Sequence, residues 1–158
     1  MTEKNWPITL IASEAPTQLG TGYPPEFAER VAGRRKQRLG DLFGLENFGV
    51  NLITLPPATQ SATRHRHMVQ DEFVYVLSGE LVLVHDEGET LLRAGACAGF
   101  RHGGTAHHLI NRSNADASYI EIGDRLPGDT AECPDDDLVP VRTETGWRYT
   151  RKNGEPYA

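Results

Sequence analysis

The sequence predicts an all-β domain of short antiparallel strands, arranged as a sandwich or barrel. Two observations lead to this fold class. Between residues 48 and 123, runs rich in β-branched and aromatic residues are separated by turn residues roughly every eight to twelve positions, as in sandwiches and barrels. In the same region, no segment keeps a helical periodicity over a convincing length. Residues 1–47 and 124–158 are expected to be N- and C-terminal extensions of this domain.

The expected strands follow from the alternation of residues and from the turns between the runs. In the first run, "FGVNLITL", alternation puts Asn51, Ile53 and Leu55 on one face of a strand. Turns are expected at "PPAT", at Ser78-Gly79, at 86–88 and at 94–95. The strands expected in chain order are 48–55, 61–67, 72–78, 80–85, 89–93, 97–100, 107–111 and 117–123.

The N-terminal extension, residues 1–47, is rich in proline, glycine and charge. Its segment "YPPEFAERVAGRRK" is compatible with a short helix, because Pro25 suits a first helical position and Gly33 can end the helix. The basic run 34–38 follows directly. We interpret this run as a solvated face, and a docking site for an acidic partner or an anionic ligand is the alternative.

The C-terminal extension, residues 124–158, is polar but ends with three aromatic side chains, Trp147, Tyr149 and Tyr157. Asn153-Gly154 is typical of a tight turn. A tail with this many aromatic residues is expected to pack on another surface, either the outer face of the barrel or a neighbouring subunit.

Length and composition exclude several classes of protein. A chain of 158 residues suits one domain, and its net charge of −6 argues against general nucleic-acid binding. No apolar run approaches the ~20 residues of a membrane span, and the N-terminus lacks a signal peptide, so we expect a cytoplasmic protein with no membrane partner. Two cysteines, Cys97 and Cys133, do not form a disulfide framework. Cys97 is expected to pack as a small apolar residue, with a catalytic thiol as the lesser alternative.

Three histidines and one glutamate are the candidate ligands of a metal ion. His65 and His67 share one face of a strand, and Glu72 opens the next strand on the face that carries Val74. A carboxylate beside apolar residues is costly to bury alone, and a metal ion would offset that cost. If His107 also faces inward, the four side chains suit a divalent transition metal with open positions. Unrelated surface histidines are the alternative.

The arrangement of these residues resembles the two motifs of the cupin superfamily. The first family motif, His-x-His followed by Glu and Gly, matches His65, His67, Glu72 and Gly79 with the family spacing. The second matches at Gly95, Gly104, His107 and Asn111. The resemblance covers about residues 50–123 and implies a double-stranded β-helix, or jelly-roll barrel, at 48–123. It also implies that His65, His67, Glu72 and His107 bind the metal.

One position departs from the family motif. The proline expected two residues before Gly104 is His102, so the turn "RHGG" should be looser and more polar. We interpret His102 as a surface loop residue. It is also the one candidate acid or base beside the motifs, since an unperturbed imidazole titrates near neutral pH. By alternation, the side chains of Asp71 and His108 point away from the face that carries the candidate ligands.

The resemblance leaves the reaction open, because one fold supports many chemistries. The favoured hypothesis is a metal-dependent enzyme of oxygenase, isomerase or lyase type that acts on a small polar molecule, with one divalent ion of Fe, Mn, Ni or Zn. A non-catalytic module that binds or senses a small ligand is the main alternative. A metal-free enzyme of the epimerase type is a third hypothesis, against which the complete ligand set argues.

A homodimer is the expected assembly. Phe73 and Leu77 alternate with inward-facing residues and should leave apolar side chains on the outer face of the barrel. An open sheet edge also invites pairing. A monomer whose own extensions cover these faces is the alternative.

Overall fold

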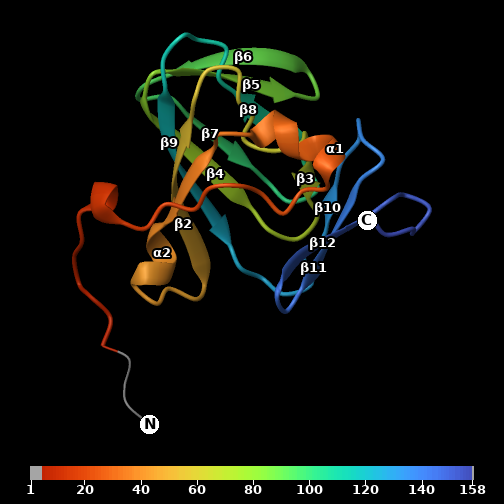
Figure 1. Ribbon diagram of the computed structural model, residues 1–158, viewed down its shortest axis with the longest axis horizontal. Helices are drawn as coiled ribbons and strands as arrows, with labels where there is room; N and C mark the ends of the chain where they lie inside the picture. The colour runs from red at the N-terminus through yellow and green to blue at the C-terminus, as the bar shows by residue number, and fades with distance from the viewer. Residues whose placement is uncertain (1–4, 158) are drawn as a thin grey trace.

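The computed structural model describes residues 5–157, and β-strands make up most of its regular structure (Figure 1). The strands are β1 (Arg35–Arg38), β2 (Phe48–Leu55), β3 (Arg66–His67), β4 (Glu72–Ser78), β5 (Glu80–His85), β6 (Gly88–Arg93), β7 (Cys97–Phe100), β8 (His107–Ile110), β9 (Ala117–Asp124), β10 (Ala131–Glu132), β11 (Val139–Thr143) and β12 (Gly146–Thr150). The helices are α1 (Pro25–Ala28) and α2 (Leu39–Leu42), with 3-10 turns at Ala12–Glu14 and Glu29–Val31.

Two larger antiparallel sheets enclose the main core. One has the order β1-β2-β9-β4-β7 and the other the order β6-β5-β8, while β3 pairs with β10 and β11 pairs with β12. The core cluster takes Ile53, Val76 and Tyr119 from the first sheet and Leu81 and Leu109 from the second. The predicted all-β architecture is confirmed. Among the described residues, no helix has the length and hydropathy of a membrane span.

Alternation predicted the central strands well. β2, β4 and β5 have the predicted bounds, and the inward residues Ile53, Val74 and Val76 are fully buried while Phe73 and Tyr75 are exposed. Gly79 forms the turn after β4 with a φ of +73°. A Cβ atom at this glycine would lie 2.9 Å from the Cβ of Ala117, so the turn requires glycine.

The predicted strand at 61–67 is wrong over most of its length. The structure has a strand only at Arg66–His67 and two isolated bridges to β8, Gln60 with Ile110 and His65 with His107. Between these bridges the loop advances five residues while β8 advances three, so the loop has two residues too many for a continuous ladder. The second bridge places His65 beside His107.

The N-terminal extension forms the predicted short helix and a strand that was not predicted. Pro25 opens α1, the 3-10 turn continues it to Val31, and Gly33 follows with a φ of +84°. The basic run then forms β1, the edge strand beside β2. Because side chains alternate along β1, Lys36 and Arg38 lie on one face of the strand and Arg35 lies on the other.

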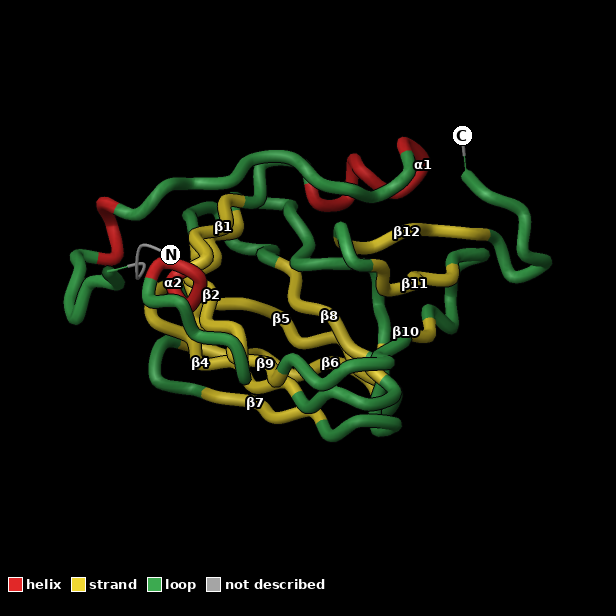
Figure 2. The backbone as a smooth tube through the Cα atoms, turned by 90° about the horizontal axis from the view of Figure 1, so that it is seen from below, coloured by secondary structure: helices red, strands yellow, loops and turns green. Residues whose placement is uncertain are grey.

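The aromatic tail packs on the N-terminal extension of the same chain. Tyr149 contacts Tyr23 with ring centroids 5.1 Å apart, and Tyr157 contacts Phe27 at 5.7 Å. Figure 2 shows α1 and β12 on the same side of the molecule. The Cys97 prediction is wrong: this residue is exposed, because β7 pairs it with Tyr75 on the outer face of the sheet.

Candidate metal centre

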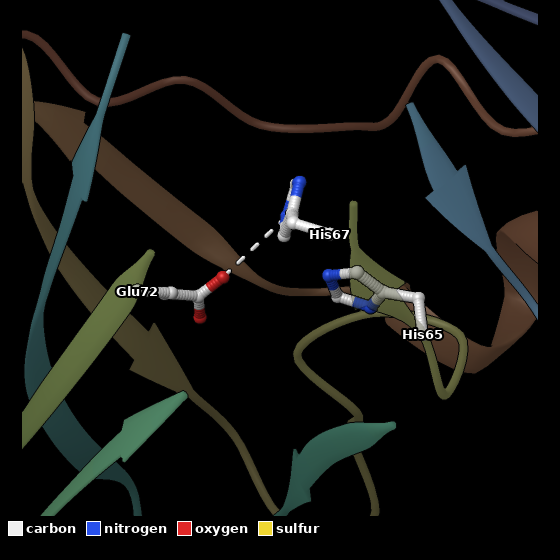
Figure 3. Close-up of side chains that lie close together, drawn as sticks. All are labelled: His65, His67 and Glu72. Carbon is white, nitrogen blue, oxygen red and sulfur yellow. Dashed lines mark ion pairs between the residues drawn. The ribbon is translucent and has the colours of Figure 1, made fainter. Parts of the chain in front are cut away.

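Two imidazoles from the β3 region meet a carboxylate from the start of β4. Nε2 of His67 lies 3.6 Å from Oε2 of Glu72, and the ring centroids of His65 and His67 are 5.0 Å apart. One ligand atom from each of His65, His67 and Glu72 lies within 4.8 Å of the others. Figure 3 shows the three side chains pointing toward one another. The structure therefore brings the first three predicted ligands together.

His107 joins this group from β8. Two backbone hydrogen bonds link it to His65, with N–O distances of 3.1 and 2.8 Å, so the two imidazoles start from paired positions. Nε2 of His107 lies 3.5 Å from Oε1 of Glu72. Its ring stacks on Phe100 with centroids 3.4 Å apart and an interplanar angle of 3°, which fixes the plane of the imidazole.

The Nδ1 atoms of all three imidazoles bond to oxygen atoms. The partners are the Thr63 carbonyl for His65 at 2.8 Å, the Asp129 carboxylate for His67 at 2.6 Å and the Thr105 carbonyl for His107 at 3.3 Å. Because these oxygens accept, each Nδ1 carries the hydrogen and each Nε2 keeps a lone pair. This is the tautomer that binds a metal through Nε2.

The four side chains fit a divalent transition metal. Nε2 of His107 is buried and has no hydrogen-bond partner among residues 5–157, and such an unpaired atom is costly unless a ligand satisfies it. Metal–nitrogen distances of about 2.0–2.1 Å place two donors of one ion about 3–4 Å apart. The 3.5 and 3.6 Å separations between imidazole nitrogens and Glu72 oxygens lie in this range.

Burial keeps His65 neutral and its neighbours keep Glu72 ionised. Burial lowers the pKa of His65 to about 4, outweighing the raising effect of the Glu72 charge. Burial alone would raise the pKa of Glu72, but its close contacts with the imidazoles of His107, His65 and His67 favour the ionised carboxylate and hold that pKa below its ordinary value. A neutral His65 and an ionised Glu72 are the forms of these side chains that coordinate a metal.

The cluster lines a cavity of about 870 Å³. The N-terminal extension lines it through Tyr23 and the C-terminal hairpin through Trp147, whose ring centroid lies 6.2 Å from that of His67. The two extensions therefore help to enclose the site. The cavity also holds the polar side chains of β1, β2 and β9 described below.

The side chains of β1, and that of Arg34 directly before it, alternate between this cavity and the opposite face of the strand. Arg34, Lys36 and Arg38 line the cavity, whereas Arg35 forms an ion pair with Asp116 outside it. This alternation differs from the predicted solvated face. Nε of Arg34 is buried and has no hydrogen-bond partner within residues 5–157. The side chain of Arg38 is 56% exposed.

His102 does not join the other candidate residues. Its Nδ1 lies 2.7 Å from Oδ1 of Asp71, its backbone N–H donates to the same oxygen at 2.8 Å, and the side chain is half exposed. These two bonds hold the pKa of Asp71 below its usual value. Neither residue lines the cavity. The structure places His102 at the surface, as the loop interpretation expects.

Sequence reasoning missed three residues of the site. Asp129 orients His67 from a polar loop, Trp147 lies beside the same imidazole, and Glu121 projects into the cavity from β9. Only Glu121 had a usable signal: in "ASYIEIG" it shares a face with Tyr119, whose side chain is buried. The other two come from segments distant in sequence.

The comparisons with known proteins place this site in a family. The sequence model of the cupin domain matches residues 51–123. A crystal structure of a sugar phosphate isomerase from a cupin superfamily, from Silicibacter pomeroyi, is 40% identical to this chain. The match covers 95% of this chain and 96% of that one, with a TM-score of 0.89. The chain belongs to the cupin superfamily.

Other solved structures extend this comparison. A candidate sugar phosphate isomerase from Acidithiobacillus ferrooxidans is 29% identical and covers 76% of this cupin and 77% of its own chain, with a TM-score of 0.70. The polyketide cyclase RemF from Streptomyces resistomycificus is 15% identical over 77% of this cupin and 82% of its own chain, with a TM-score of 0.63. That likeness shows the fold alone. No protein of curated function matches the sequence.

Proposed function

We propose that this cupin is a metal-dependent isomerase of phosphorylated sugars. The observation that carries the proposal is one cavity that holds both a metal-ligand cluster and a row of cations, Lys36 and Arg38 of β1 and Arg34 directly before it. The 40% identity to a sugar phosphate isomerase over nearly the whole chain supports the same reaction class.

The cavity offers a separate partner for each end of a sugar phosphate. His65, His67, Glu72 and His107 would hold a divalent ion, which supplies a Lewis acid for carbonyl and hydroxyl oxygens of the sugar. Arg34 and Arg38 carry guanidinium groups that suit a phosphate. Arg38 is the better placed of the two to gain a new partner, because its one ion pair within residues 5–157, with Asp41, is long at 4.0 Å.

The experiment compares phosphorylated and unphosphorylated sugars. Metal-loaded protein is incubated with a panel of aldose and ketose phosphates and with the matching free sugars, and the products are followed by NMR. We expect interconversion of an aldose phosphate and its ketose, lost after chelation and restored by metal. His107→Ala should lose both metal and activity, and His102→Ala is the matched control.

A second pair of variants tests the phosphate contact. Arg38→Met should raise KM for the phosphorylated substrate, whereas Arg35→Met, on the other face of the same strand, should not. Binding of sugar phosphates without any turnover would support a non-catalytic module instead. Neither binding nor turnover, with the metal in place, would refute the proposal.

A further inference from the structure

Glu121 is a second carboxylate in the cavity that the metal cluster does not use. β9 pairs Glu121 with Asn51 of β2 on one side and with Val74 of β4 on the other. Since Val74 faces the interior and paired residues share a face, Glu121 also points inward. Its side chain is 24% exposed and lines the cavity.

Two donors from neighbouring strands hold this carboxylate. Nδ2 of Asn51 donates to Oε1 of Glu121 at 3.0 Å, and Nζ of Lys36 donates to the same oxygen at 3.3 Å. Both bonds use Oε1, which leaves Oε2 available to accept a proton. The contacts fix the orientation of the side chain.

Glu121 and Glu72 line the same cavity from neighbouring strands. Glu72 pairs with Gly123, two residues beyond Glu121 on the same strand, so the two glutamates are diagonal neighbours with Cα atoms roughly 7–8 Å apart. Gly123 pairs in turn with Gly49, and both glycines line the cavity. No side chain from these two positions fills the space beside Glu72.

From this geometry we infer that Glu121 is the residue that moves the proton between adjacent carbons of the sugar phosphate. The inference rests on the proposed function and adds a catalytic residue to it. Oε2 removes the proton from the carbon next to the carbonyl group. The C–H electron pair forms a C=C bond, and the carbonyl π pair moves onto oxygen to give an enediolate.

Protonation of the former carbonyl carbon completes the reaction. The hydroxyl proton of the enediolate passes to the former carbonyl oxygen, and Glu121 returns its own proton to the former carbonyl carbon. The electron pair left on the other oxygen forms the new carbonyl group. Atoms and electrons balance without an oxidant, a reductant or a consumed water molecule. Lys36 and Asn51 act as positioning residues for the carboxylate.

The test uses Glu121→Gln in the metal-loaded protein with an aldose phosphate in D2O. NMR follows two quantities, conversion to the ketose and replacement of carbon-bound hydrogen by deuterium. Since a general base contributes about 10²- to 10⁴-fold, we expect both rates to fall by that factor while metal content stays unchanged. Glu144→Gln is the matched control, because Glu144 also lines the cavity but lies in the turn between β11 and β12.

Glu121→Asp separates a catalytic role from a structural one. This variant keeps a carboxylate and should retain more activity than Glu121→Gln, with thermal unfolding measured for both. Wild-type turnover with unchanged rates in Glu121→Gln would overturn the inference and leave the isomerase proposal intact. Equal loss of activity and of folding stability in both variants would also overturn it. An inactive, metal-loaded wild type would refute both proposals.

Discussion

The hydrogen bond between Asp129 and His67 should set the metal affinity of this cupin. Asp129 is fully buried, and its Oδ2 accepts from Nδ1 of His67 at 2.6 Å while Oδ1 accepts from the backbone N–H groups of Val69 and Gln70. In Asp129→Asn, the amide oxygen can keep the backbone bonds. The amide nitrogen would then face Nδ1 and favour the tautomer that carries hydrogen on Nε2.

The size of the effect follows from the loss of this single orienting bond. Replacing such a partner of a ligand histidine typically lowers metal affinity roughly 10- to 100-fold, which corresponds to about 1.4–2.7 kcal/mol. Competition with a fluorescent chelator measures the affinity of the folded protein. Asp116→Asn is the control, because that exposed carboxylate pairs with Arg35 away from the cavity. An Asp129→Asn affinity within twofold of wild type would refute the reasoning.

Three further predictions concern stability, thiol reactivity and assembly. Gly79→Ala should destabilise the fold by about 1–3 kcal/mol in chemical denaturation, since its φ is +73°, whereas Gly22→Ala has open space and should be near neutral. A thiol reagent at neutral pH should modify exposed Cys97 in the folded protein and spare Cys133, whose pKa is raised by burial; equal labelling rates would contradict this. We propose a homodimer through the outer face of the five-stranded sheet, where Tyr75 is exposed. Light scattering should therefore give a mass of twice 17.5 kDa for the wild type and the mass of a monomer for Tyr75→Glu. A monomeric wild type would rule out this dimer.

Strand positions were predictable because short runs rich in β-branched and aromatic residues are bounded by turn residues. The observed bounds of β2, β4 and β5 equal the predicted ones. The segment 61–67 alternates less clearly, and its pairing depends on how many residues separate two bridges to β8. The number of residues between the two bridges cannot be deduced from the sequence, because it depends on the register of this segment with β8. Cys97 was misplaced for the same reason, since its face depends on its partner Tyr75.

The metal ligands were predictable because most of them lie close together in sequence. His65, His67 and Glu72 lie within one hairpin-sized segment, and the family spacing added His107. Asp129 gave no comparable signal. It lies 62 residues from His67 in a polar loop, where an aspartate is an ordinary surface residue. Its role depends on the β3–β10 pairing, which the sequence does not reveal.

The environment of the basic run 34–38 was also not predictable from the sequence, for a different reason. Its composition was compatible with either a solvated face or an anion site, and both environments occur on the same strand. β1 pairs Lys36 with Ile53 and Arg38 with Asn51, so these two cations follow the inward face of β2. Arg35 is on the opposite face. Which residues meet the cavity was decided by the register with β2, a feature of the folded sheet.

Along the strands of the large sheet, the inner face changes from buried apolar side chains to polar ones. The part of the sheet that stabilises the fold is therefore separate from the part that lines the site. At one end, Ile53 pairs with Tyr119, which pairs with Val76, and all three are buried in the core. Two residues along, the equivalent row contains Asn51 and Glu121. Polar groups in such positions cost free energy unless they are bonded.

The next row completes this transition from core to site. It pairs Gly49 with Gly123 and Gly123 with Glu72, so that two positions of this row carry no side chain and the third carries a ligand carboxylate. A sheet optimised only for stability would fill this row with apolar side chains. The apolar rows hold the strands in register, and this register makes Glu121 and Glu72 diagonal neighbours that line the same cavity. The fold therefore keeps two carboxylates apart, with one beside the imidazoles and the other free to exchange a proton.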